Sequence, residues 1–123
     1  MLIDPPFEEA GEFERIVSGL RRAYDRWPGG IYALWYPIKD RKSVAAFHED
    51  LRKPGIKKML RIESTIRGAG ADPRLDGSGM IVINPPYTLF DELSVILPVL
   101  TKTLALDSGA GSRLDWIAGE QDP

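Results

Sequence analysis

Three short apolar segments in this chain each stop at proline, and this punctuation strongly limits what the chain can fold into. The segments span 1–3, 31–36 and 79–83. They are followed in turn by Asp4-Pro5-Pro6, Pro37 and Asn84-Pro85-Pro86. Proline has no backbone N–H and cannot continue a sheet ladder, so each segment predicts a strand that ends there.

Helical patterns fill the intervals between these segments. Ser43 is the expected N-cap of a helix at 43–51, and Pro98 predicts a kink in a helix at 89–104. Residues 68–79 are rich in Gly, Asp and Pro and predict a loop. Apolar spacing at three- and four-residue steps predicts helices at 13–27, 43–51 and 89–104, and further apolar segments predict strands at 56–67 and 114–118.

The order of these elements predicts an α/β fold, because strands alternate with helices. The segment 31–36 is continuously apolar, which is typical of a strand buried on both faces of a parallel sheet. The strands at 56–67 and 79–83 follow each other directly and predict an antiparallel hairpin. We therefore expect a mostly parallel sheet with an antiparallel hairpin at one edge.

Composition excludes several classes of site. The chain has 123 residues, enough for one ordinary domain, and contains no cysteine and a single histidine, His48. A disulfide framework, a thiolate metal site and a multi-histidine metal site are therefore excluded, and we expect no metal. No apolar run is long enough to span a bilayer, so we expect a cytoplasmic protein without a membrane partner.

Charge is distributed unevenly along the chain. Residues 15–61 hold 12 Lys and Arg against four Asp and Glu, although the whole chain has a net charge of −2. A basic segment on an acidic chain is compatible with a surface that faces phosphate groups. The simpler alternative is that these cations cover the solvated faces of two helices.

The sequence Asp4-Pro5-Pro6-Phe7 is the strongest candidate for chemistry. An adenine amino group is a poor nucleophile, because its lone pair is delocalised into the ring. The Asp4 carboxylate and the Pro5 carbonyl can accept its hydrogens, rigid prolines can hold these acceptors in place, and the Phe7 ring can stack on an extruded base. The alternative is a Pro-Pro strand stop with an aspartate that caps the next helix.

Other motifs are interpreted as structural. The stretch Asn84 to Tyr87 follows the second hairpin strand, which should run antiparallel to the Asp4 strand and end at the opposite edge. Neither Gly68-Ala69-Gly70 nor Gly109-Ala110-Gly111 follows a parallel strand and opens a helix, as a cofactor loop should. We expect His48, which has no partner within reach in the sequence, at the surface or half buried, and we expect Trp35 and Tyr36 in the core.

Five stretches that span almost the whole chain carry a family resemblance: Leu2 to Phe7, Tyr32-Ala33-Leu34-Trp35-Tyr36-Pro37, Ser78 to Pro86, Leu97-Pro98 and Trp116-Ile117. On these stretches the chain resembles the C-terminal half of the RlmJ family of large-subunit ribosomal RNA methyltransferases. The resemblance implies a class I methyltransferase fold that uses S-adenosylmethionine to methylate adenine N6 in ribosomal RNA. Asp4, Pro5, Pro6 and Phe7 would then be the catalytic motif. The complete sheet would run 3-2-1-4-5-7-6, with strands 4, 5, 7 and 6 in this chain.

The resemblance also implies that a large part of the enzyme is not in this sequence. Residues 1–123 correspond to the C-terminal half of the catalytic domain, without the half that carries the cofactor loop. We therefore expect no cofactor-binding residues here and no methyl transfer by this chain alone. The alternative is a non-catalytic module that binds RNA or self-associates through the exposed edge of the Asp4 strand. A DNA methyltransferase parent is disfavoured by the Tyr32 to Pro37 match.

Overall fold

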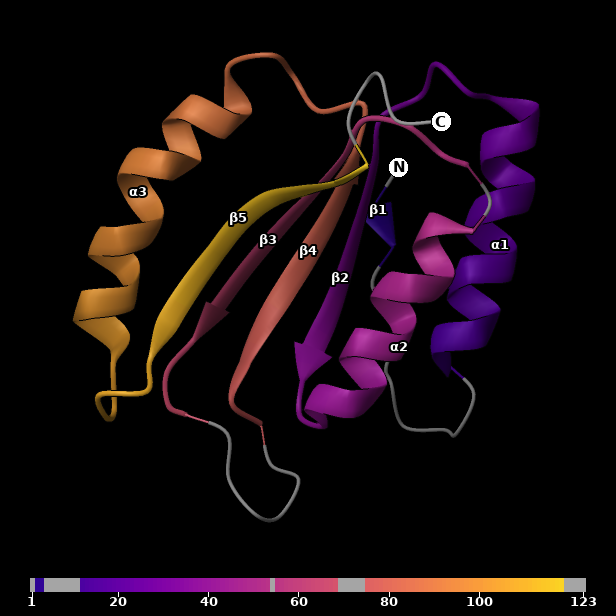
Figure 1. The fold of residues 1–123 in the computed structure, drawn as a ribbon. Coiled ribbons are helices and arrows are strands. Elements are labelled where there is room, and N and C mark those ends of the chain that lie inside the picture. Colours follow the sequence, from indigo (N-terminus) through magenta and orange to yellow (C-terminus); the bar gives the residue numbers. More distant parts are fainter. Residues whose placement is uncertain (1, 4–11, 54, 69–74, 119–123) are drawn as a thin grey trace.

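The computed structural model describes residues 2–3, 12–53, 55–68 and 75–118. Five strands form one sheet, and three helices flank it (Figure 1). The elements in chain order are β1 (Leu2–Ile3), α1 (Glu12–Arg26), β2 (Tyr32–Ile38), α2 (Arg41–Arg52), β3 (Met59–Thr65), β4 (Gly77–Ile83), α3 (Leu89–Leu104) and β5 (Gly111–Ala118).

The strand order is β1-β2-β4-β3-β5, and only the pair β1–β2 is parallel. The pairs β2–β4, β4–β3 and β3–β5 are all antiparallel. The expectation of a mostly parallel sheet is therefore wrong for the described residues. The reason is that β4, the second strand of the β3–β4 hairpin, lies between β2 and β3. Strands β2 and β3 point the same way, but each pairs with the antiparallel β4 and not with the other. The order β1-β2-β4-β3 agrees with the strand order that the family resemblance implied.

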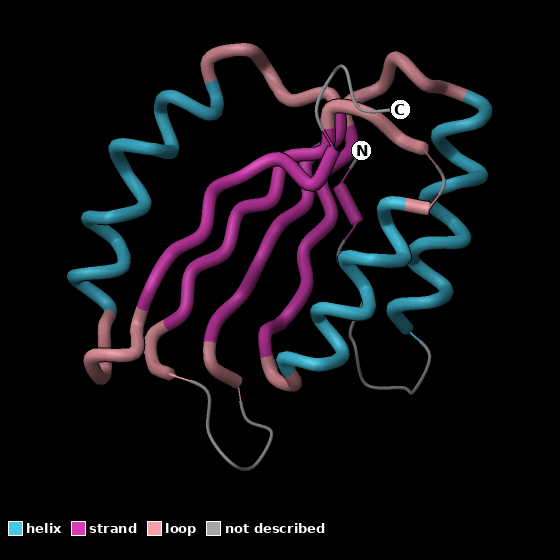
Figure 2. The backbone as a smooth tube through the Cα atoms, viewed as in Figure 1, coloured by secondary structure: helices cyan, strands magenta, loops and turns pink. Residues whose placement is uncertain are grey.

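The two faces of the sheet are covered unequally. Helices α1 and α2 lie on one face, and α3 lies on the other, beside β5 and β3 (Figures 1 and 2). The main core lies under α1 and α2, where Leu20, Leu34 and Phe47 are each about 1% exposed. Burying one such side chain contributes roughly 1.5–3 kcal/mol. On the other face, the Phe90 ring of α3 stacks on Trp116 of β5 with a centroid distance of 6.1 Å.

Helix α2 begins earlier than expected. Its N-cap is Asp40, whose carboxylate accepts hydrogen bonds from the Lys42 backbone N–H and the Ser43 hydroxyl. The expectation that Ser43 caps this helix is wrong, because Asp40, in the short connection after β2, offers the stronger acceptor three residues upstream. Ser43 supports the cap from within the first turn.

Candidate functional site at one edge of the sheet

The strands β1, β2 and β3 end at the same edge of the sheet. Strand β1 pairs in parallel with β2, with Ile3 opposite Leu34. Since β4 is antiparallel to both β2 and β3, these two also point the same way, toward the bottom of Figure 1. Ligands in open α/β sheets bind beyond the carboxyl ends of parallel strands.

The residues expected to be catalytic follow β1 directly in the sequence. Asp4, Pro5, Pro6 and Phe7 lie outside the described residues, so their role stays a prediction. The structure does place Ile3, the residue before them, at the carboxyl end of a strand paired with β2. Strand β1 therefore ends at the edge where β2 and β3 also end.

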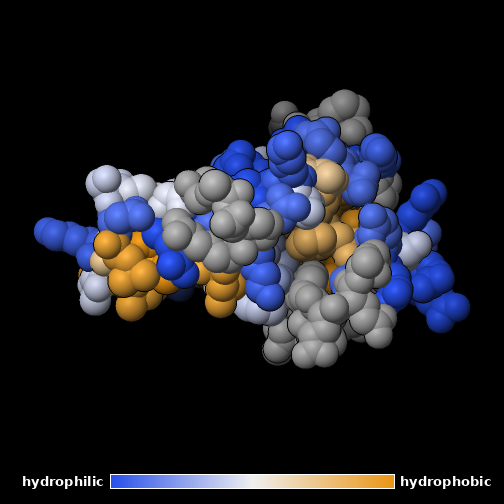
Figure 3. Space-filling model, turned by 90° about the horizontal axis from the view of Figure 1, so that it is seen from below, coloured by the Kyte–Doolittle hydropathy of each residue, from blue (hydrophilic) through white to orange (hydrophobic). Residues whose placement is uncertain are grey.

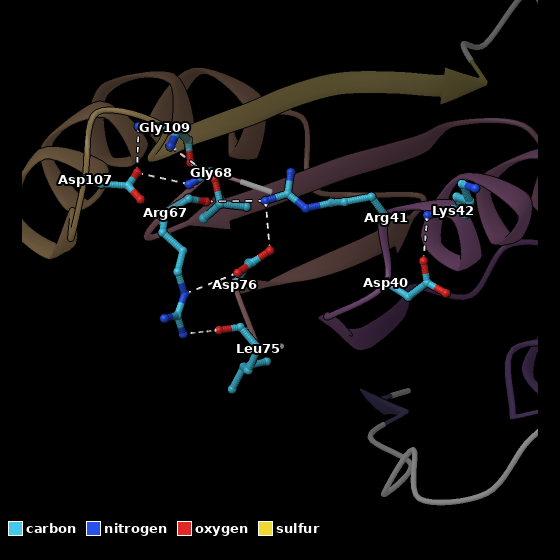
Figure 4. A network of polar contacts seen from close by, with 11 residues as sticks. Asp40, Arg41, Lys42, Arg67, Gly68, Leu75, Asp76, Asp107 and Gly109 are labelled. Carbon is cyan, nitrogen blue, oxygen red and sulfur yellow. Dashed lines mark hydrogen bonds and ion pairs between the residues drawn. The ribbon is translucent and has the colours of Figure 1, made fainter. Parts of the chain in front are cut away.

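Charged residues from three loops meet at this edge. Asp76, just before β4, is 2% exposed and forms ion pairs with Arg41 at 3.3 Å and Arg67 at 3.2 Å (Figure 4). Arg67 also donates to the Leu75 carbonyl at 2.7 Å. Two guanidinium groups compensate the buried carboxylate, and together they fasten the loops after β2 and β3 to the start of β4.

Neither glycine pair is arranged as a cofactor loop in the part of the chain that the structure describes. The backbone N–H groups of Gly68 and Gly109 both donate to the Asp107 carboxylate, at 3.0 and 2.7 Å (Figure 4). A cofactor loop instead offers its backbone N–H groups to the ligand. These glycines connect the end of β3 to the start of β5, and their N–H groups are directed at Asp107 and not left for S-adenosylmethionine.

A buried polar network lies behind the edge, under α2. The Tyr36 hydroxyl donates to the Glu63 carboxylate at 2.6 Å and lies 3.1 Å from His48 Nε2. Arg61 donates to His48 Nδ1 at 3.2 Å and binds Asp115 through two hydrogen bonds of 2.7 and 2.5 Å. The expectation of a surface or half-buried His48 is wrong, because His48 is 5% exposed. Its partners Tyr36 and Arg61 are 12 and 13 positions away in the sequence.

The protonation of this network follows from its donors. A guanidinium can only donate, so His48 Nδ1 accepts from Arg61 and the ring proton lies on Nε2, facing Tyr36. Burial and then the charge of Arg61 lower the pKa of His48 to about 4. Burial and the Glu63 carboxylate raise the pKa of Tyr36 far above its ordinary value. The hydrogen bond from Arg61 lowers the pKa of Asp115. At neutral pH, His48 and Tyr36 are therefore both uncharged.

Gly79 makes this network possible. Tyr36, Gly79 and Glu63 lie side by side on β2, β4 and β3. The Tyr36 ring crosses over β4 at Gly79 to reach Glu63, and a Cβ atom on Gly79 would lie 2.3 Å from the ring. Sequence reasoning identified neither Gly79 nor Glu63, because their roles depend on register between strands.

The Asn84 stretch has a structural role, as expected. Strand β4 runs antiparallel to β2, and so also to β1, and Asn84 lies at the opposite edge from the end of β1. Its side-chain amide donates to the carbonyls of Pro28 and Gly30, both at 2.8 Å. Asn84 has a positive φ of 55°, a backbone conformation that asparagine tolerates better than most residues. It ties the end of β4 to the loop before β2.

A titration experiment tests the environment of His48. The folded-state pKa of about 4 lies below the ordinary 6.5, so the unfolded chain binds more protons between these values. The contribution of neutral His48 to the free energy of unfolding is therefore fully present above pH 6.5 and is lost as the pH falls toward 4. Between pH 7 and 5, His48 should account for a loss of about 2 kcal/mol in the free energy of unfolding. Urea unfolding at both pH values measures it, and His48→Gln should remove most of this loss. An equal loss in the variant would contradict the assignment.

Comparisons with known proteins bear on the site. Residues 1–118 match the family model described as RsmJ: Ribosomal RNA large subunit methyltransferase D, RlmJ. The chain belongs to this family. It is 38% identical over 120 residues to proteins named Ribosomal RNA large subunit methyltransferase J from Haemophilus influenzae and Escherichia coli. These matches cover 98% of this chain and 43% of each relative.

A solved structure supports the same relationship. Protein LPL1258 from Legionella pneumophila, described with the family model DUF519, aligns with a TM-score of 0.84 at 28% sequence identity. The alignment covers 98% of this chain and 43% of that protein. The RlmJ-family chain described here thus spans less than half the length of the curated relatives it matches. The fold agrees over almost all of this shared portion.

The described part of this RlmJ-family chain contains neither a metal-binding cluster nor a membrane-spanning helix. Within residues 2–3, 12–53, 55–68 and 75–118, no group of three or more His, Asp or Glu side chains is placed to hold a metal ion. None of the described helices is long and apolar enough to cross a membrane.

Proposed function

We propose that this chain is the C-terminal portion of an S-adenosylmethionine-dependent methyltransferase that acts on adenine N6 of ribosomal RNA. Asp4, Pro5, Pro6 and Phe7 form its acceptor site for the base. The observation that supports this most directly is the parallel pairing of β1 with β2, since the motif follows β1 at the edge where ligands bind in such sheets. The family membership supplies the reaction class.

The chemistry assigned to this motif is the orientation of an amino group. The Asp4 carboxylate and the Pro5 carbonyl accept the two amino hydrogens, which directs the nitrogen lone pair toward the methyl donor. Phe7 stacks on the flipped base. S-adenosylmethionine is the donor implied by the family. Since the described glycine pairs do not fit it, no step of its binding is assigned to them, and we propose that the isolated chain does not transfer methyl groups.

A chimera tests the proposal. This chain would replace the matching 120 residues of the Escherichia coli relative. The chimera should transfer label from S-adenosylmethionine to adenine N6 of ribosomal RNA, detected by nucleoside analysis, whereas the isolated chain should give none. A folded chimera without activity, or turnover by the isolated chain, would contradict the proposal. Duplex DNA serves as the competing substrate.

The alternative proposal is a self-associating module, and the outer face of α3 favours it. Val95, Val99 and Leu104 of α3 are 71%, 63% and 52% exposed, and Figure 3 shows hydrophobic residues gathered over this helix. Strand β1 is also the outermost strand on its side of the described sheet. Exposed apolar surface of this kind drives association. Light scattering should then report a dimer or larger species, and a monomer across the accessible concentrations would contradict it.

A further inference from the structure

A shallow cleft opens beside β3 and β5. It has a volume of about 200 Å³ and is lined by Arg41, Glu63, Thr65, Gly111, Ser112 and Arg113. These residues follow β2, end β3 and begin β5, so the cleft lies at the edge of the sheet where β1 also ends. Figure 3 looks onto this edge, where hydrophilic side chains cover much of the surface between α3 and α2.

Two arginines give the cleft its cationic character. The side chains of Arg41 and Arg113 are 42% and 54% exposed. Arg41 contacts Asp76 and the Arg67 carbonyl through Nη2 alone, and Arg113 contacts Asp115 through Nε at 3.6 Å. Each guanidinium carries five N–H donors. Among the described contacts, most of these donors remain available to a ligand in the cleft.

Each carboxylate around the cleft has a further hydrogen-bond or ion-pair partner besides the two arginines. Asp115 is held mainly by Arg61, and Asp76 is shared with Arg67. Glu63, the one carboxylate of the lining, accepts the Tyr36 hydroxyl, and its side chain is only 12% exposed. The N-terminus of α2 contributes little here, because Asp40 caps it. The two arginines and the Ser112 hydroxyl therefore dominate what an incoming ligand meets.

These observations favour an anion with several oxygen atoms. Arginine forms paired hydrogen bonds with phosphate oxygens, and two guanidinium groups suit one phosphodiester. Strands lie about 4.8 Å apart, so the cleft is about 14–19 Å along the edge from β1. That distance corresponds to a few nucleotides from a base held after β1.

We propose that this cleft binds a backbone phosphate of RNA on a nucleotide that flanks the target adenine. The inference rests on the proposed function, since it takes RNA as the substrate. It adds a positioning site at Arg41 and Arg113, on the same edge as the Asp4 motif. Each phosphate contact to a single strand contributes about 0.7 to the slope of log affinity against log salt.

The test is RNA binding by this chain. Fluorescence anisotropy with a labelled single-stranded RNA oligonucleotide would be measured across about 50 to 200 mM salt. Arg113→Gln should weaken binding roughly three- to tenfold at low salt and reduce the salt slope by about 0.7. The control is Arg52→Gln, which removes the same charge at similar exposure from the far end of α2 and should leave the slope unchanged. Equal slopes for all three proteins would overturn the proposal.

A second variant and a second probe complete the design. Arg41→Gln should have the same effect as Arg113→Gln, and its melting temperature is checked because it removes a partner of buried Asp76. If Arg41→Gln does not fold, Arg113→Gln decides alone. Inorganic phosphate serves as the probe for a free-anion site. If the chain binds phosphate but does not bind the RNA oligonucleotide, the proposal is overturned.

The outcome is separable from that of the proposed function. Methyl transfer is read in the chimera, whereas the cleft is read as RNA binding by the chain itself. An active chimera with unchanged RNA binding in Arg113→Gln would reject the cleft alone. An inactive chimera with the expected loss in Arg113→Gln would reject the proposed reaction alone.

Discussion

Gly79→Ala is expected to lower the free energy of unfolding by about 3 kcal/mol. The new Cβ atom would lie 2.3 Å from the Tyr36 ring, which is fully buried and cannot move away without disturbing Phe47 and His48. A displaced Tyr36 hydroxyl would also leave the Glu63 carboxylate without its 2.6 Å hydrogen bond. Both the steric overlap and the lost hydrogen bond therefore act in the same direction.

Urea unfolding measures this effect, and the chain offers a matched control. Gly19 lies in the middle of α1, where an added Cβ atom would meet nothing within 4 Å. Gly19→Ala should stabilise the protein by about 0.5–1 kcal/mol, because alanine favours helix. In a Tyr36→Leu background, Gly79→Ala should cost much less, since the overlapping ring is gone. If Gly79→Ala lowers the free energy of unfolding by the same amount in that background, overlap with the Tyr36 ring is not the cause.

Asp4→Ala in the chimera is expected to reduce kcat for methyl transfer to adenine by about 10²–10³-fold. The variant removes the carboxylate that we propose orients the amino group. RNA affinity should change little, because the variant leaves the proposed phosphate-binding arginines Arg41 and Arg113 in place. The expected pattern is thus a lower kcat at a similar KM.

The matched control for Asp4→Ala is Asp25→Ala, which removes an exposed carboxylate from α1. This control should retain the activity of the unmodified chimera. If Asp4→Ala also retains it, the motif is only a strand stop, as the structural alternative holds. Loss of RNA binding in parallel with activity would instead indicate that Asp4 supports folding or binding rather than orientation.

The local elements could largely be predicted from the sequence. Proline punctuation located the end of β4, and apolar spacing located α1, α2 and α3. The expectation that the second strand ends at Pro37 is wrong, because β2 continues through Pro37, opposite Ser78, to Ile38. The structural role of Asn84 also followed from the hairpin, since a strand that turns back ends at the opposite edge. These features depend on residues close together in the chain, where periodicity and the geometry of proline act directly.

Pairing and the polar interior could not be predicted in this way. Continuous apolarity in β2 suggested a strand buried on both faces of a parallel sheet, yet β4 pairs antiparallel with it. His48 contacts Arg61 and Tyr36, 13 and 12 positions away, and no local pattern shows such a contact. Similarly, the need for glycine at position 79 appears only when three strands are in register.

The sequence by itself determined where strands and helices form, and its motifs indicated the family and the candidate acceptor Asp4-Pro5-Pro6-Phe7. Only the tertiary structure decided the antiparallel pairing of β2 with β4 and of β3 with β5, the buried network around Tyr36 and His48, and the arginine cleft at the edge. The physical reason is the range of the interactions. Proline stops and amphipathic spacing act over a few residues, whereas strand register and buried hydrogen bonds join residues that only folding brings together.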